Sequence, residues 1–365
     1  MMSKKSPQLR FEGFTDDWEE RKFADFIDVK SGKDYKHLNS GSIPVYGTGG
    51  YMLSVDRALS DIDAIGIGRK GTIDKPYLLK APFWTVDTLF YAVPKQNIDL
   101  QFSLSIFKRI NWKKFDESTG VPSLSKTVIN SVGASVPSYE EQQKIGSFFK
   151  QLDNTITLHQ RKLDLLKEQK KGYLQKMFPK NGAKVPELRF AGFTDAWELR
   201  KSKELCTIST GKGNTQDKVD DGAYPFYVRS ATIEKSDEYL YDQEAVLTVG
   251  DGVGTGKVYH YVNGKYNLHQ RVYRMYDFKD VSAKYFYYYF SNNFYKRVMS
   301  MTAKTSVDSV RMEMIADMNI VFPSVKEQEN IVELFSNLDN TIALHQRKLD
   351  LLKEQKKGFL QKMFV

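Results

Sequence analysis

Apolar side chains recur every three and four residues along two stretches of the chain, 137–178 and 323–365, with polar side chains between them. This spacing gathers the apolar residues on one face of a long α-helix, as in a coiled coil. We therefore expect the apolar residues to form a helix–helix interface. Its predicted members are Ile145, Phe149, Leu152, Ile156, His159, Leu163 and Leu166 in the first stretch, and Ile331, Phe335, Leu338, Ile342, His345, Leu349 and Leu352 in the second.

The two stretches have nearly the same sequence. Leu152–Phe178 and Leu338–Phe364 differ only at Thr157/Ala343 and Tyr173/Phe359. Two such helices in one chain can pair with each other, and we predict an antiparallel pair about an internal pseudo-two-fold axis. A second apolar stripe, off the predicted interface, is formed by Leu158, Leu165, Leu344 and Leu351. This stripe is available either to another chain or to the neighbouring part of this one.

Each helical stretch begins with Pro-Ser and has a glutamate three residues after the serine, at Glu141 and Glu327. In this spacing the serine caps the first turn while the glutamate reaches back to it, which is a capping box. Polar side chains interrupt the apolar face at His159, His345 and two lysines. Such residues cost stability but fix the register of a coiled coil, an interpretation that we favour over metal binding by the histidines.

The repeat also includes the segments before the helices, because Pro7–Lys22 and Pro186–Lys201 match closely. The chain thus contains two copies of one plan. In residue numbers it predicts an arm (1–22), a first domain (23–136), a long helix (137–178), a linker with a second arm (179–201), a second domain (202–322) and a second long helix (323–365).

The two domains are less alike, and both contain short strand-like runs separated by glycine turns. These runs lie at Ile43–Tyr46, Ala64–Gly68, Phe83–Val93, Tyr224–Val228, Ala245–Val249, Lys257–Val262 and Arg271–Tyr276, and helical patterns follow at Leu100–Ile110 and Ala283–Met299. We therefore predict mixed α/β (α+β) domains, each with a twisted sheet. The aromatic run Tyr285–Phe290 could stack on nucleic-acid bases, but its helical spacing favours a place in the core.

Composition narrows the class of protein. The 365 residues carry a net charge of +9, which permits a polyanionic partner, and the single cysteine, Cys206, excludes a disulfide framework within the chain. No apolar run is long enough to span a membrane, and the N-terminal residues lack the apolar segment of a signal peptide. We expect a cytoplasmic protein.

Sequence motifs for catalysis are absent. Glycine-rich turns recur at Ile67–Lys75 and Val249–Val258. The second resembles a phosphate-binding loop, but Asp251 and Val258 stand where such a loop requires Gly and Ser or Thr. Gly120–Lys126 and Thr305–Arg311 combine hydroxyl groups with a cation, which suits phosphate contact and helix capping equally. The pattern favours a subunit for binding and assembly over an enzyme.

Two variable domains, each followed by a near-identical helix that opens with Pro-Ser-x-x-Glu-Gln, resemble the specificity subunit of type I restriction–modification systems. The Leu-Asp-Asn-Thr-Ile and Leu-Lys-Glu-Gln-Lys-Lys-Gly segments carry the same resemblance. It implies that each domain recognises half of a bipartite, asymmetric DNA site. The helices would set the spacer and dock two methyltransferase subunits, which restriction and translocase subunits join. S-adenosylmethionine, ATP and Mg²⁺ would bind those partners, with no cofactor, metal or catalytic residue in this chain.

The candidate DNA contacts are basic, hydroxyl and polar residues near the glycine turns and before the long helices. They are Arg69, Lys70, Lys75, Ser123, Ser125 and Lys126 in the first domain, and Tyr227, Arg229, Lys257, Gln270, Arg271, Ser309 and Arg311 in the second. The alternative is a coiled-coil adaptor that binds proteins and has no nucleic-acid function. Salt-dependent binding to random-sequence duplex would distinguish the two.

Overall fold

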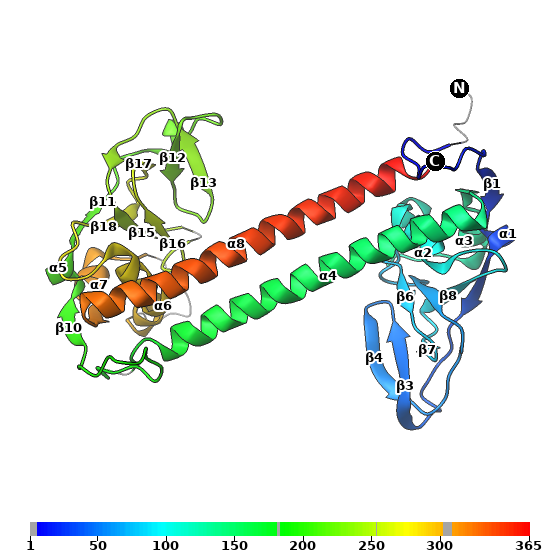
Figure 1. The fold of residues 1–365 in the computed structure, drawn as a ribbon, viewed down its shortest axis with the longest axis horizontal. Coiled ribbons are helices and arrows are strands. Elements are labelled where there is room, and N and C mark those ends of the chain that lie inside the picture. The colour runs from blue at the N-terminus through cyan, green and yellow to red at the C-terminus, as the bar shows by residue number, and fades with distance from the viewer. Residues whose placement is uncertain (1–5, 181–182, 253, 302–308) are drawn as a thin grey trace. The chain divides into compact units, whose positions relative to one another are not determined.

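The computed structural model describes residues 6–180, 183–252, 254–301 and 309–365. The chain divides into two compact units, Met1–Arg161 with His345–Val365, and Lys162–Leu344. Each unit holds one domain, the beginning of the long helix that leaves it and the end of the other long helix (Figure 1).

The secondary structure repeats in the same order in the two halves. The first half has β1 (Glu19–Lys22), α1 (Phe23–Phe26), β2 (Ile27–Ser31), β3 (Ser40–Gly47), β4 (Gly50–Val55), β5 (Ala64–Gly68), β6 (Tyr77–Leu79), β7 (Trp84–Thr85), β8 (Leu89–Pro94), α2 (Leu100–Arg109), the 3₁₀ turn η1 (Trp112–Phe115), α3 (Lys126–Ser131), β9 (Gly133–Val136) and α4 (Tyr139–Lys176). The second half has β10 (Glu198–Lys201), α5 (Ser202–Leu205), β11 (Thr207–Thr210), the 3₁₀ turn η2 (Thr215–Asp217), β12 (Tyr224–Tyr227), β13 (Ile233–Ser236), β14 (Tyr241–Asp242), β15 (Ala245–Val249), β16 (Tyr259–Val262), β17 (Lys265–Leu268), β18 (Val272–Tyr276), α6 (Ala283–Ser300), α7 (Met312–Ala316), β19 (Asn319–Phe322) and α8 (Val325–Lys362).

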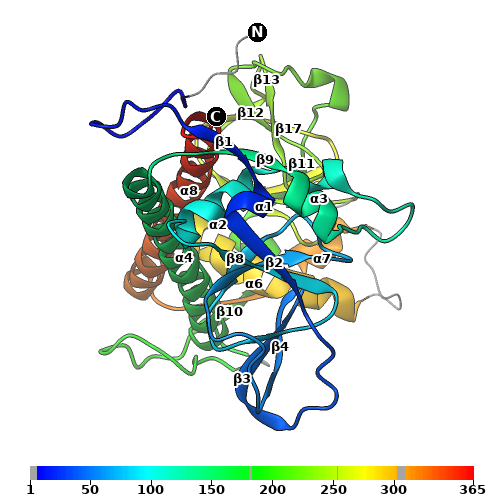
Figure 2. The ribbon, with the colours of Figure 1, turned by 90° about the vertical axis from the view of Figure 1, so that its right-hand side faces the viewer.

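The first domain contains two larger sheets, with strand orders β2-β8-β5-β6 and β4-β3-β7, and its last strand, β9, pairs with β1 of the arm. Successive side chains of β5 alternate between its faces. Ile65 and Ile67 therefore pack in the core that includes α2, whereas Ala64 belongs to a smaller cluster on the other side. Figures 1 and 2 show β3 and β4 extending from this domain on the side away from α2.

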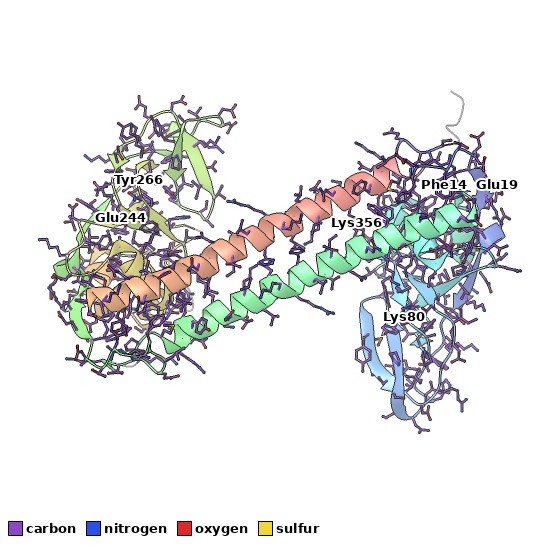
Figure 3. The ribbon with its side chains drawn as sticks, viewed as in Figure 1. Phe14, Glu19, Lys80, Glu244, Tyr266 and Lys356 are labelled. Carbon is purple, nitrogen blue, oxygen red and sulfur yellow. The ribbon has the colours of Figure 1, made fainter. Side chains whose placement is uncertain are left out.

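The second domain repeats this plan with sheets β11-β18-β15-β16 and β13-β12-β17-β14. Val246 packs on the side of α6, and Leu247 packs with Tyr266 between the sheets. Tyr266 is labelled in Figure 3. The aromatic run at the start of α6 is buried, because Tyr285, Phe286 and Phe290 are each 0% exposed. This confirms the prediction that the run belongs to the core.

The long helices pair in antiparallel fashion within each unit, as predicted. In the first unit the Lys356 ammonium lies 2.5 Å from Asp153, and His159 meets His345. In the second unit Lys170 pairs with Asp339, which is the same pair of repeat positions. An internal two-fold relation makes equivalent positions of the two repeats pair in this reciprocal way.

Most predicted interface residues are buried, and the rest are half-buried. Buried are Ile145, Phe149, Leu163, Leu166, Ile331, Phe335, Leu338, Leu349 and Leu352, whereas Leu152, Ile156, His159, Ile342 and His345 are partly exposed. The polar residues at this interface pair across it, His159 with His345 and each lysine with an aspartate of the other helix. This pairing supports their predicted role in setting the register.

The capping-box prediction is wrong for the glutamates. The backbone N–H of Glu141 does donate to Ser138 Oγ at 3.4 Å, but the Glu141 carboxylate accepts two bonds from Arg10, at 2.7 and 2.8 Å. Glu327 binds Arg189 in the same way. A guanidinium brings a full charge and two parallel donors to a buried carboxylate, which a neutral backbone N–H cannot match.

The predicted strand Phe83–Val93 is also wrong in extent. The chain forms β7 and β8 there, separated by a turn at residues 86–88. β7 pairs in parallel with β3, whereas β8 pairs with β2 and β5 in the other sheet. The turn therefore carries the chain from one sheet to the other.

Within the described ranges, no helix combines the length and apolarity needed to cross a bilayer. The same part of the chain contains no cluster of three or more His, Cys, Asp or Glu side chains that could hold a metal ion.

Candidate nucleic-acid interface

The same local arrangement occurs in both domains. The turn after a buried central strand, β5 or β15, meets the segment that precedes a short helix, α3 or α7. An isolated bridge pairs Lys70 with Ser123 in the first domain and Asp251 with Ser309 in the second. Beside these bridges, the N–H of Leu124 donates to Arg69 O at 2.9 Å and that of Val310 to Gly250 O at 2.7 Å. Lys70 and Asp251 therefore occupy equivalent positions in the two domains, as do Arg69 and Gly250.

In the first domain this arrangement forms an open cleft of about 520 Å³, the first cleft. It is lined by Ser31, Arg69, Lys70, Phe90, Glu117, Ser123, Leu124, Ser125 and Lys126. Five of the six predicted DNA contacts of this domain therefore lie together. The sixth, Lys75, is exposed but does not line the cleft.

Acidic side chains shape the segment that carries Ser123 and Ser125. Asp116 accepts the backbone N–H of Ser123 at 2.9 Å, and this bond, with others from Ser118, lowers the pKa of Asp116. Glu117 accepts the N–H of Ser125 at 2.8 Å. Ser125 Oγ in turn accepts the N–H of Val128, so this hydroxyl caps α3. The capping alternative is therefore confirmed for Ser125.

In the second domain the corresponding second cleft has a volume of about 430 Å³. It is lined by Thr210, Gly250, Asp251, Gln270, Arg271, Tyr273, Ser309, Val310, Arg311, Met312 and Glu313. The predicted contacts Gln270, Arg271, Ser309 and Arg311 meet here. Arg229 lines an adjoining cavity together with His269, and Thr305–Asp308 lie outside the described residues.

Two predicted contacts of the second domain lie elsewhere. The Tyr227 side chain is only 9% exposed, and its ring packs 4.9 Å from that of His260. Burial raises the pKa of Tyr227, and the residue is part of the core between the sheets. The Lys257 ammonium lies over the ring of Tyr295 at 5.0 Å. For these two residues DNA contact stays a prediction without support from their position.

Sequence reasoning missed Asp251, Thr210 and Ser31 as cleft residues. The predicted contacts are basic, hydroxyl and polar residues near the glycine turns and before the long helices, whereas Asp251 is an acid. The two small residues, at the ends of β11 and β2, reach the clefts through strand pairing, which has no local signal in the sequence.

The predicted second apolar stripe lies on the surface of the helices. Leu158 and Leu344 are each 64% exposed, Leu165 is 67% exposed and Leu351 is 51% exposed. Leucines so exposed do not contribute to the helix–helix interface.

Both halves of the chain match a known family. Residues 15–168 and 194–354 each match the type I restriction modification DNA specificity domain. The MjaVIII specificity subunit, a type I restriction enzyme subunit of Methanocaldococcus jannaschii, is 22% identical over 329 residues, which cover 82% of this chain and 75% of that protein. The EcoDI specificity subunit of Escherichia coli is 26% identical over 165 residues, 45% of this chain and 36% of its own.

The fold is also shared with a solved structure. The crystal structure of the type I restriction–modification S subunit from M. genitalium has a TM-score of 0.79, at 13% identity, with 99% of each chain covered. The matches give no support to the alternative of an adaptor without nucleic-acid function. Because the specificity domain is matched twice and together the matches span most of the sequence, the chain belongs to the family of type I restriction–modification DNA specificity proteins.

Proposed function

We propose that this chain is the non-catalytic specificity subunit of a type I restriction–modification complex, in which each domain recognises one half of a bipartite, asymmetric DNA site. The observation that carries the proposal is the pair of clefts, which occupy the same place in both domains but differ in chemistry. Shared backbone geometry gives each domain the same means of approaching a duplex. The different side chains give each domain a different base preference.

Charge in the first cleft suits a phosphate backbone. Arg69, Lys70 and Lys126 line the cleft beside the hydroxyl group of Ser123. Cations and hydroxyl groups position a protein on phosphates, while base edges supply the sequence information. Arg69 is partly fixed, because its Nη1 donates to Asp87 O at 3.4 Å and its guanidinium lies 5.9 Å from the Phe90 ring centroid.

Differences at equivalent positions account for an asymmetric site. Lys70 is a cation with hydrogen-bond donors, whereas its counterpart Asp251 is an acid flanked by Arg229 and Arg271. Each base pair presents its own pattern of donors and acceptors in the major groove. Two clefts with opposite chemistry at the same position therefore select different half-sites.

The long helices serve assembly in this proposal. The exposed leucines at 158, 165, 344 and 351 would dock two methyltransferase subunits, and the length of the helices would set the spacer between the half-sites. Methyl transfer, DNA cleavage and translocation would belong to partner subunits, which would also bind S-adenosylmethionine, ATP and Mg²⁺. A DNA substrate would place the complex in the cytoplasm.

Sequencing the methylated sites in cells that carry this chain with its partner subunits tests the function. We expect one bipartite motif with two different halves. Exchanging residues 23–136 for those of a relative should change one half and leave the other intact. A modification pattern that does not depend on this chain would refute the proposal, and a swap that altered both halves would refute independent recognition. Purified chain should also bind random duplex less tightly as salt rises.

A further inference from the structure

A single carboxylate lies between two arginines at the second cleft. Arg229 Nη1 is 3.7 Å from Asp251 Oδ1, and Arg271 Nε is 3.7 Å from Asp251 Oδ2. The arginine side chains are 50% and 65% exposed, whereas that of Asp251 is 30% exposed. The acid thus lies deeper than the two cations, which are available to a ligand.

The N–H groups of Arg229 and Arg271 form no hydrogen bond with Asp251. A separation of 3.7 Å is an ion pair but exceeds hydrogen-bond length. Asp251 Oδ1 is buried and has no hydrogen-bond partner among the described residues. A buried carboxylate oxygen without a partner is costly, and the two guanidinium charges are what offsets its charge. Asp251 therefore attracts both guanidinium groups without consuming their N–H groups.

The loop that carries Arg271 is fixed from several sides. The N–H of Arg271 donates to His269 Nδ1 at 3.0 Å, and Arg271 O accepts the N–H of Gly250 at 2.8 Å. His269 is 5% exposed, and its Nε2 lies 3.4 Å from Thr215 Oγ1. Burial, together with the charge of Arg229, lowers the pKa of His269, which favours the neutral ring whose Nδ1 can accept. The backbone of Arg271 is therefore held in place before a ligand arrives.

A guanidinium held in this way suits one base. Arginine presents parallel N–H groups that match O6 and N7 of guanine in the major groove, the most common specific contact between protein and DNA. We propose that Asp251 is a positioning residue that holds Arg229 and Arg271 to recognise guanine in the half-site of the second domain. This inference rests on the proposed function.

The first domain provides an internal comparison. β3 pairs with β7 as β12 pairs with β17, which aligns Tyr46 with Tyr227 and Thr85 with Leu268. Counting on from these pairs, Thr48 and Thr88 occupy the positions of Arg229 and Arg271. With Lys70 at the position of Asp251, the first cleft lacks both the arginine pair and its carboxylate. The substitutions proposed below should therefore leave the first half-site unchanged.

Selection of bound sequences from a randomised duplex library, with the full-length chain and its partner subunits, tests this inference. The half-site that changes when residues 202–322 are exchanged identifies the second domain's half. We expect at least one fixed guanine there. Asp251→Asn should reduce the preference for that guanine roughly 10- to 100-fold. Asp251→Glu should retain most of it, and the first half-site should not change.

Arg271→Lys and Arg229→Lys provide an independent measurement, because both side chains are exposed and the substitutions keep the charge. At least one should relax the guanine preference while phosphate-dependent affinity persists. Asp237→Asn, an exposed acid in the same domain, serves as the charge control. All variants are compared by melting temperature.

A bipartite site whose second half has no fixed guanine would overturn the inference and leave the proposed function standing. The same conclusion would follow if Asp251→Asn and both arginine variants kept the guanine preference of the parent chain. A parent chain that selects no bipartite site would refute both proposals.

Discussion

The imidazole rings of His159 and His345 meet Nδ1 to Nδ1 at 3.2 Å, and the two residues occupy the same position of the repeat. A neutral imidazole has one donor and one acceptor nitrogen. One ring must therefore donate to the other, so two equivalent residues take different roles in this bond. The contact replaces an apolar layer of the helix pair with a single hydrogen bond.

This pairing predicts strong coupling between the two histidines. His159→Leu should destabilise the protein by about 1 kcal/mol, because it leaves a half-buried nitrogen of His345 without its partner. His345→Leu should behave alike, whereas the double variant should cost less than the sum because both polar groups are gone. Urea unfolding of the four proteins measures the coupling. Additive effects would show that the contact contributes nothing.

Asp153 predicts a dependence of stability on pH. Burial raises the pKa of this carboxyl, but hydrogen bonds from Lys108 and Lys356 outweigh it, so the pKa lies below its usual value. A lowered pKa contributes stability that is present above the unfolded value of about 3.9 and is lost as pH falls further. Asp153→Asn should cost about 1–3 kcal/mol at neutral pH. The difference from the parent chain should shrink below about pH 4.

Unfolding of both proteins at several pH values gives the comparison. Glu12→Gln, which changes an exposed acid in the same unit, is the control. A constant difference between parent and Asp153→Asn from pH 7 to pH 3 would contradict the assigned role.

Cys206 should be unreactive in the folded protein. Burial raises the pKa of its thiol to about 12, and Sγ donates to Ser202 O at 3.3 Å. At pH 8 only roughly one thiol in ten thousand is then ionised, and the thiolate is the reactive form. A thiol reagent should label Cys206 slowly until urea unfolds the chain. Asp61→Cys in a Cys206→Ser background supplies an exposed thiol for calibration, and equal rates at both sites would refute the prediction.

The exposed leucines of the long helices predict where a partner binds. Leu158→Asp together with Leu344→Asp should weaken co-purification of methyltransferase subunits, because charge replaces an apolar contact, without changing the melting temperature. Leu240→Asp, at a leucine 43% exposed on the second domain, is the matched control. Undiminished co-purification of the double variant would place the docking surface elsewhere.

The helices also predict the spacer. Seven residues lengthen a helix by about 10 Å, which corresponds to about three base pairs of DNA. A heptad that copies the apolar pattern, inserted after both Leu166 and Leu352, preserves the helix–helix interface. The half-sites should stay the same while the spacer grows. Sequencing the modified sites measures the spacer. An active variant that keeps the original spacer would show that the helices do not set the spacer length.

Local patterns were sufficient to predict the helices and several strands. The second long stretch, 323–365, is helical at Val325–Lys362, and the strands Ala64–Gly68 and Ala245–Val249 have the predicted bounds. The break between β7 and β8 had no such signal, because pairing with strands distant in sequence decides it. The partner of Glu141 also had no local signal, because Arg10 lies in the arm, far away in the sequence.

For the candidate site, residue type and position in the sequence predicted the five cations that line the two clefts. The burial of Tyr227 had no local signal, because alternation along a strand does not tell which face is the interior. The position of Asp251 between Arg229 and Arg271 depends on three separate segments that only the folded sheet brings together.

The two arms contact the ends of the two long helices in the same way. The N–H of Leu188 donates to Lys176 O at 2.9 Å, and the N–H of Leu9 donates to Lys362 O at the same distance. In the first case a short covalent linker joins helix and arm, whereas in the second the same contact forms between residues at opposite ends of the sequence. Each arm therefore contacts the end of a long helix, in one case next to it in the sequence and in the other through this contact alone. A permuted chain opened in the 179–184 linker, with residue 365 joined to the first arm by a copy of that linker, should keep both helix–arm contacts.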